Sequence, residues 1–107
     1  MKNVVANIQA NLPVLFLREG EHFIAFTPAL DLSTVGKTYE EAKKRFDEAV
    51  EIFFEEIVKR GTLEQSLLDL GWAKHEGTLI PPQLIGQDHI TVPLKFDAAK
   101  IDSLAKV

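Results

Sequence analysis

The strongest constraint on the fold is an abrupt change of pattern at residues 36–38. Before Gly36 the residues are short, β-branched or polar, as in "LSTV", whereas after Thr38 apolar side chains recur with helical spacing for about six turns. The apolar stripe consists of Tyr39, Ala42, Phe46, Ala49, Val50, Phe53, Ile57 and Val58. The pattern predicts a long amphipathic helix whose apolar side lies on a sheet.

Both ends of this helix carry local signals. Thr38 lies three residues before Glu41, which is the spacing of a capping box. We expect the Thr38 hydroxyl to accept a free backbone N–H and the Glu41 carboxylate to reach back to the N–H of Thr38. Gly61 marks the end of the helix, and Gly36 lets the chain turn from strand into helix. Gly36, Lys37 and Thr38 do not predict a phosphate-binding loop, because "LSTV" lacks the glycine which that motif requires.

Short strands are predicted before the helix. Residues 12–18 and 23–27 are apolar and are joined by a polar turn, and Pro28 ends the second run because proline cannot donate to a strand ladder. Residues 32–37 are the third strand, and residues 4–8 have a similar strand-like composition. The expected fold class is α+β: a three-stranded antiparallel β-meander followed by a long amphipathic helix on one face.

The C-terminal third predicts smaller elements. Thr62 and Gln65 repeat the capping-box spacing, so "LEQSLLDL" is expected to form a short second helix that Gly71 closes. From Trp72 onward the pattern predicts a strand, an extended turn centred on Pro82 and another strand.

The chain is expected to consist of a core, residues 1–75, and a C-terminal extension, residues 76–107. The last part of the extension has Ala98, Ile101, Leu104 and Ala105 at helical spacing behind Asp97, which predicts a short helix with an aspartate cap. This extension could act as a dimerisation arm.

Composition narrows the class of protein. The 107 residues are enough for one hydrophobic core, and 46% hydrophobic with 26% charged residues is an ordinary globular balance. A formal net charge of −4 opposes a large contact with nucleic acid. The absence of cysteine excludes disulfides and thiolate zinc sites and fits a reducing cytoplasm. No apolar run approaches the about 20 residues of a membrane helix, and no signal-peptide pattern opens the sequence. We expect a cytoplasmic protein.

Catalytic motifs are not apparent. His22, His75 and His89 are far apart and belong to no metal-binding motif, and no serine lies in a G-x-S-x-G elbow. No cofactor or metal is expected, and the protein is predicted not to be an enzyme. The enzymatic alternative is a small metal-dependent hydrolase that uses the carboxylates of Asp31, Glu40 and Glu41.

Charge on the long helix is unevenly distributed. Acid-to-base pairs four residues apart balance both ends of the helix: Glu40–Lys44, Glu41–Arg45, Glu55–Lys59 and Glu56–Arg60. Residues 47–58 contain no base. This run is either a solvated face or a docking surface for a basic partner. The candidate partner-binding residues are Asp47, Glu48, Glu51 and Glu55.

Residues 12–60 resemble the HicB family, the antitoxin half of HicA–HicB toxin–antitoxin pairs. The residues that carry the resemblance are Pro28, Leu30, Gly36, Thr38, Glu40, Glu41 and Ala42. Asp31 departs from the pattern, because many members have glycine at that place, and we interpret it as a turn variant. Pro28, Gly36, Thr38 and Glu41 are the expected structural junction.

The resemblance implies a fold and a function. The HicB fold is similar to a truncated ribonuclease-H-like sheet with its helix laid across one face. Since the predicted opening strand "LPVLFLR" contains no carboxylate, the resemblance implies a binding scaffold without the metal site of ribonuclease H. HicB proteins neutralise a small basic ribonuclease, the HicA toxin, by covering its active surface.

Many HicB proteins also carry a C-terminal DNA-binding module. The segment from His89 onward looks like the strand and first helix of a ribbon-helix-helix unit, and the chain ends before a second helix. The predicted function is therefore that of a non-enzymatic antitoxin that forms a homodimer or higher oligomer. The alternative is a transcriptional regulator that binds DNA through the C-terminal strand and helix.

Overall fold

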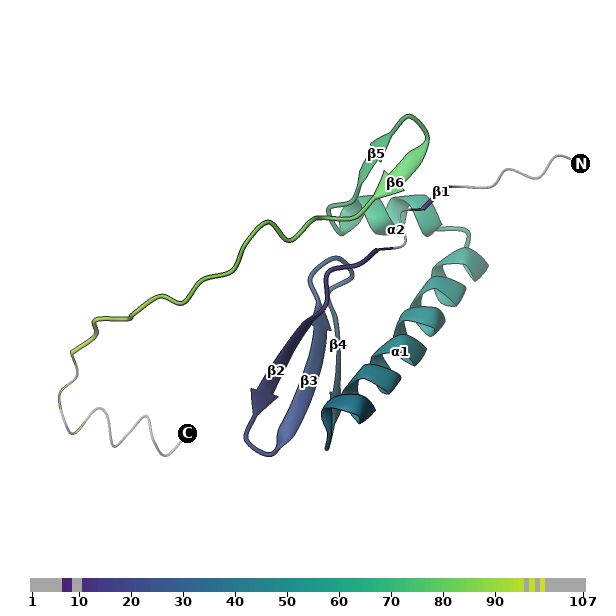
Figure 1. The fold of residues 1–107 in the computed structure, drawn as a ribbon. Coiled ribbons are helices and arrows are strands. Elements are labelled where there is room, and N and C mark those ends of the chain that lie inside the picture. Colours follow the sequence, from purple (N-terminus) through teal and green to yellow (C-terminus); the bar gives the residue numbers. More distant parts are fainter. Residues whose placement is uncertain (1–6, 9–10, 96, 98, 100–107) are drawn as a thin grey trace, which may run out of the picture.

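The computed structural model describes residues 7–8, 11–95, 97 and 99. It confirms the α+β class, with a meander, a long helix, a short helix and a hairpin in chain order (Figure 1). The elements are β1 (Asn7–Ile8), β2 (Leu15–Glu19), β3 (His22–Thr27), β4 (Leu32–Gly36), α1 (Tyr39–Lys59), α2 (Leu63–Asp69), β5 (Ala73–His75) and β6 (Thr78–Ile80).

The meander is an antiparallel sheet with the strand order β2-β3-β4, and α1 lies against one face of it (Figure 1). The contact is made chiefly over β4 and β3. Ala25 of β3 packs there with Ala42 and Phe46 of α1, and all three side chains are buried. The small alanines on both surfaces let the helix approach the sheet closely, so this first core cluster is thin.

A second core cluster lies at the far end of α1. It consists of Ala29, Leu30, Ile57, Leu67, Trp72 and Leu79, which come from the β3–β4 turn, both helices and the C-terminal hairpin. The indole N–H of Trp72 donates a hydrogen bond of 2.8 Å to the Ala29 carbonyl oxygen. This buried bond ties the hairpin to the meander.

The C-terminal strands correct one prediction. β5 and β6 form an antiparallel hairpin whose turn is Glu76–Gly77, and not an extended turn at Pro82. Both turn residues have positive φ, 50° and 81°, which is the requirement of a two-residue hairpin turn. Residues 81–95 contain no strand. β1 pairs in parallel with β6 rather than with the meander.

The start of α1 confirms half of the predicted capping box. Thr38 has extended backbone angles, and its hydroxyl accepts the Glu41 N–H at 3.0 Å. The Glu41 carboxylate, however, accepts the N–H of Lys37 at 2.6 Å instead of that of Thr38. The Glu41 carboxylate therefore binds the backbone N–H one residue before the predicted one.

The capping box predicted for α2 is wrong. The ψ angle of Thr62 is 20°, far from the extended value that aims a cap side chain at the helix start, and Thr62 makes no side-chain cap bond. Its hydroxyl accepts a hydrogen bond from Ser66 Oγ at 3.1 Å, and Gln65 donates to Asp69 instead. Both predicted glycine stops are confirmed, because α1 ends before Gly61 and α2 before Gly71.

The apolar stripe of α1 is confirmed at its centre and differs at its ends. Ala42, Phe46 and Ile57 are buried, and Ala49, Val50 and Phe53 are half-buried. Tyr39 and Val58 are instead 42% and 59% exposed, and the Tyr39 ring lies against Phe16 of the edge strand β2 with the ring centroids 4.6 Å apart. The sequence interpretation missed Phe54, whose ring centroid lies 6.4 Å from that of Trp72.

The C-terminal extension is described only in part. The hairpin spans residues 73–80 and thus crosses the expected boundary at residue 75; the division into 1–75 and 76–107 stays a prediction. The Asp97 carboxylate accepts the Ala99 N–H at 3.2 Å, while the remainder of the helix expected over 97–107 lies outside the described residues. Within the described residues, neither helix has the length and apolar composition needed to cross a bilayer.

Candidate functional site

The outer face of α1 carries the four candidate partner-binding carboxylates. Asp47, Glu48, Glu51 and Glu55 are all exposed. Asp47, Glu51 and Glu55 follow one another at intervals of four residues, so they form a row along the helix, with Glu48 beside it. We call these four residues the acidic row. Because a helix rises about 1.5 Å per residue, the row is about 12 Å long.

No member of the acidic row lies within 4.0 Å of a basic side chain in the described part of the chain. The predicted pairs Glu41–Arg45 and Glu56–Arg60 are confirmed, each at 3.5 Å. The pairs Glu40–Lys44 and Glu55–Lys59 do not form. The carboxylates in the middle of the helix are therefore left without partners.

An apolar side chain lies beside the acidic row, and the sequence interpretation missed it. Ile52 is 58% exposed, four residues after Glu48 and three before Glu55. A large apolar side chain within a charged surface is typical of protein–protein contacts, where the charges surround it. The sequence could have revealed Ile52, because it is a large apolar residue that lies outside the apolar stripe of the same helix.

The junction residues hold α1 against the sheet. A side-chain carbon at Gly36 would lie 2.9 Å from the Cα atom of Ala42 and from the carbonyl carbon of Glu41. The Thr34 hydroxyl donates to the Ala42 carbonyl oxygen at 2.9 Å, and the Arg45 guanidinium donates to that of Val35 at 3.0 Å. Glycine is needed here because β4 and the helix backbone almost touch.

Pro28 and Asp31 lie at the opposite end of β4. Pro28 is exposed at the turn after β3, where the Thr27 hydroxyl accepts the N–H of Ala29 at 3.2 Å. Asp31 has a φ of 51°, in the left-handed region that aspartate tolerates better than most residues other than glycine. This agrees with its interpretation as a turn variant.

Electrostatics at the junction favour an ionised Glu41. The N–H of Lys37 lowers the pKa of Glu41 below its ordinary value, and the nearby charges of Arg45 and Lys37 act in the same direction. Desolvation raises the pKa and partly opposes them. The lowered pKa keeps this carboxylate ionised to a lower pH than an ordinary glutamate.

The carboxylates of the hydrolase alternative are not brought together. Asp31 precedes β4, whereas Glu40 and Glu41 follow it, so a five-residue strand, about 17 Å long, separates them. Among the described residues no three acidic, histidine or cysteine side chains are grouped closely enough to hold a metal ion. His22, His75 and His89 are all exposed.

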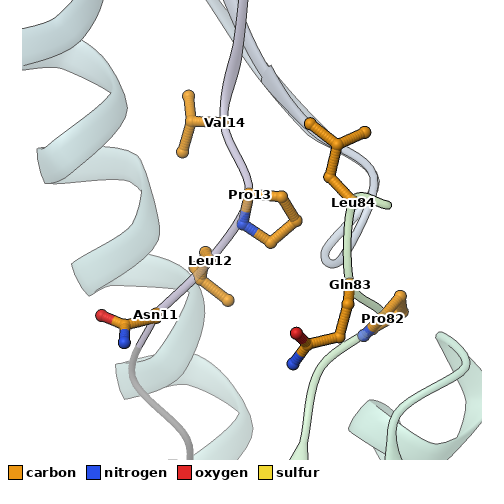
Figure 2. Close-up of a pocket in the computed structure, with 7 residues that line it drawn as sticks. All are labelled: Asn11, Leu12, Pro13, Val14, Pro82, Gln83 and Leu84. Carbon is orange, nitrogen blue, oxygen red and sulfur yellow. The ribbon is translucent and has the colours of Figure 1, made fainter. Parts of the chain in front are cut away.

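A hollow of about 390 Å³ lies between the start of β2 and the segment after β6. Figure 2 shows its lining of Asn11, Leu12, Pro13, Val14, Pro82, Gln83 and Leu84. The two amides are its only polar side chains, and no lining residue can act as an acid, a base or a nucleophile. The hollow mainly marks where two distant segments of the chain meet.

Comparisons with models of protein families, with curated proteins and with solved structures give no match for this chain. Two features of the molecular surface bear on its function: the acidic row with Ile52, and the β-β-β-α arrangement that displays it.

Proposed function

We propose that this protein is a HicB-like antitoxin that binds a small basic ribonuclease toxin of the HicA type and covers its active surface. The observation that carries the proposal is the acidic row, which is exposed and unpaired on the outer face of α1. The order β2-β3-β4-α1 supports it, because this is the order that the resemblance to HicB predicts.

The chemistry of the row suits such a partner. A ribonuclease binds a polyanion and therefore needs a positively charged surface around its active site. Carboxylates spaced along a rigid helix can occupy the positions of RNA phosphates on that surface, and Ile52 offers an apolar contact beside them. The partner is thereby inhibited through occupation of its RNA-binding surface.

The charges of the acidic row lower the stability of the isolated protein. Asp47, Glu51 and Glu55 are like charges at the four-residue spacing, which destabilises a helix. Basic side chains of a partner would relieve this repulsion. Since exposed charges act mainly on the rate of encounter, we expect the row to determine association more than dissociation.

The first test reverses two charges of the row. Glu48→Lys together with Glu51→Lys should slow association with a HicA-type toxin by about tenfold at low salt, and should flatten the salt dependence. The double variant Glu21→Lys with Glu76→Lys is the matched control, because it also changes the formal net charge from −4 to 0. Stopped-flow or surface-binding kinetics at two salt concentrations would measure the rates.

An unchanged association rate in the first double variant would contradict the proposal and leave the row as a solvated face. Equal slowing in both double variants would show that net charge alone acts. The regulator alternative finds less support in the described residues that follow β6. Residues 81–95 carry a single lysine, Lys95, while DNA binding relies on several phosphate contacts.

A further inference from the structure

β2 is an edge strand that the rest of the described chain leaves uncovered. It lies at one end of the order β2-β3-β4, and α1 lies over β3 and β4 rather than over it. Leu17 is 53% exposed on the sheet face opposite α1, and Phe16 is 38% exposed although its ring centroid lies 4.6 Å from that of Tyr39 at the start of α1. An edge strand with exposed apolar side chains is a template for pairing with another strand.

The sheet face opposite α1 continues this uncovered surface. The register aligns Leu17 with Ile24 and Val35, and Leu15 with Phe26, on the face that does not contact the helix. Ala25 and Phe23 belong to the other face, where they pack with Phe46. Val35 is 44% exposed, so apolar side chains extend across all three strands.

The chain also contains a segment with a strand-like sequence that does not pair with any strand in the described residues. Residues 83–95 are exposed and have no regular secondary structure. Ile90, Val92 and Leu94 are 85%, 63% and 64% exposed, and their alternation puts them on one side of an extended chain. We call residues 83–95 the tail.

The tail leaves the body beside the start of β2, where Pro82 and Leu84 share the hollow with Pro13 and Val14 (Figure 2). It then extends beyond the meander instead of folding along it (Figure 1).

We propose that the tail adds as a fourth strand to the β2 edge of a second copy of this chain, and that the exchange is reciprocal. With Ile90, Val92 and Leu94 beside Leu15 and Leu17, their side chains extend the uncovered sheet face. A C2 dimer of this kind pairs the free β2 edge of both copies with one set of contacts.

The backbone of the tail fits this position. In a strand, alternate residues direct their N–H and C=O groups to opposite sides. If the tail runs parallel to β2 with Ile90, Val92 and Leu94 on the face of Leu15 and Leu17, the N–H groups of these three residues face β2, and Thr91 and Pro93 face away from it. Pro93, which has no N–H, loses no hydrogen bond there, as is usual for proline on an edge strand.

Size favours tail exchange over contact between two sheet faces. Three strands about 4.8 Å apart, each about 17 Å long, present a footprint of roughly 250 Å². Each partner of a stable complex buries about 800 Å², so the sheet face alone is too small. The tail adds further contact area to such a dimer. It can also reach a second copy, because Pro82 and Ile90 are eight residues apart and the chain between them can span roughly 27 Å. This inference does not depend on toxin binding.

The test compares two prolines in the tail. Val92→Pro removes an N–H that faces β2, so the dissociation constant of the dimer should rise at least roughly tenfold. Thr91→Pro removes an N–H that faces solvent and should leave the constant near that of the unmodified protein. Analytical ultracentrifugation over a concentration series measures both. A monomeric unmodified protein, or a dimer equally insensitive to both prolines, would overturn the proposal.

A second experiment identifies which copy supplies the tail. The chain has no cysteine, so Leu17→Cys in one preparation and Val92→Cys in another introduce unique reactive sites. Treatment of the mixture with a short bifunctional maleimide should join two chains. If the combined variant Leu17→Cys with Val92→Cys became linked only within single chains, the tail would occupy its own β2, and the exchange would be disproved.

Discussion

Gly36 lies where β4 gives way to α1, and its missing side chain sets the distance between the sheet and the helix. A Cβ atom at this position would approach the Cα atom of Ala42 to 2.9 Å, and the neighbouring atoms are backbone that cannot rotate aside. We predict that Gly36→Ala lowers the free energy of unfolding by about 1–3 kcal/mol.

Urea denaturation followed by circular dichroism would measure this change. The matched control is Gly86→Ala, because a Cβ atom at Gly86 meets no other atom within 4 Å. Its effect should remain within about 0.5 kcal/mol. A loss of similar size in both variants would indicate that backbone freedom, rather than close approach, explains Gly36.

Glu41 provides a pH-dependent contribution at the same junction. Because the N–H of Lys37 holds its pKa below the ordinary value of 4.5, the folded protein binds the proton less readily than the unfolded chain does. The stabilisation is therefore present above pH 4.5 and is lost as the pH falls through the lowered pKa. Denaturant midpoints between pH 3 and pH 6 should show a shallower acid loss in Glu41→Gln than in the unmodified protein.

Glu40→Gln is the control for this measurement, since Glu40 lies in the same helical turn without the backbone contact. If Glu41→Gln retained the full acid dependence, the Lys37 contact would not stabilise the folded state. Because Glu41 is exposed, the effect should also weaken at high salt to the extent that Arg45 contributes.

At the scale of elements, local pattern predicted α1 and the three strands of the meander because periodicity and a cap act within a few residues. The same reasoning was wrong for Thr62, because the three-residue spacing does not determine the ψ angle of the cap residue. It also misplaced the C-terminal turn, because Glu76–Gly77 adopts a turn that requires two positive φ angles, one of them at a glutamate.

Some features of the candidate site were likewise predictable from local sequence pattern, and others were not. Exposure of the acidic row followed from the helical period alone, and the structure agrees. The bond from Trp72 to Ala29 could not be predicted, because 43 residues separate its partners. The uncovered edge of β2 could not be predicted either, because it depends on where α1 crosses the sheet.

The two threonines provide a comparison between helices. Thr38→Ala removes a true cap bond and should destabilise the protein by about 0.5–2 kcal/mol. Thr62→Ala removes only an exposed hydroxyl contact with Ser66 and should cost less than about 0.5 kcal/mol. Denaturant midpoints of both variants would decide. Equal losses would contradict the assignment of Thr38 as the only capping side chain of this pair.

At the scale of the whole molecule, one body holds two core clusters formed by different parts of the chain. The first joins the meander to the beginning of α1, while the second needs the end of α1, α2 and the hairpin. The acidic row extends along α1 between the two ends of the body. If the tail is exchanged as proposed, each dimer displays two such rows.

The bond between Trp72 and Ala29 has a consequence for the order of folding. The strands of the meander meet across short turns, whereas the second core cluster must close a loop of 43 residues, and the entropy of closure slows such contacts. Trp72 is also the single tryptophan of the chain. In stopped-flow refolding, its fluorescence should therefore change after the β-sheet signal in far-ultraviolet circular dichroism, and simultaneous changes would show that both clusters form in one step. The fluorescence of Trp72 thus reports when the second core cluster forms, without any added label.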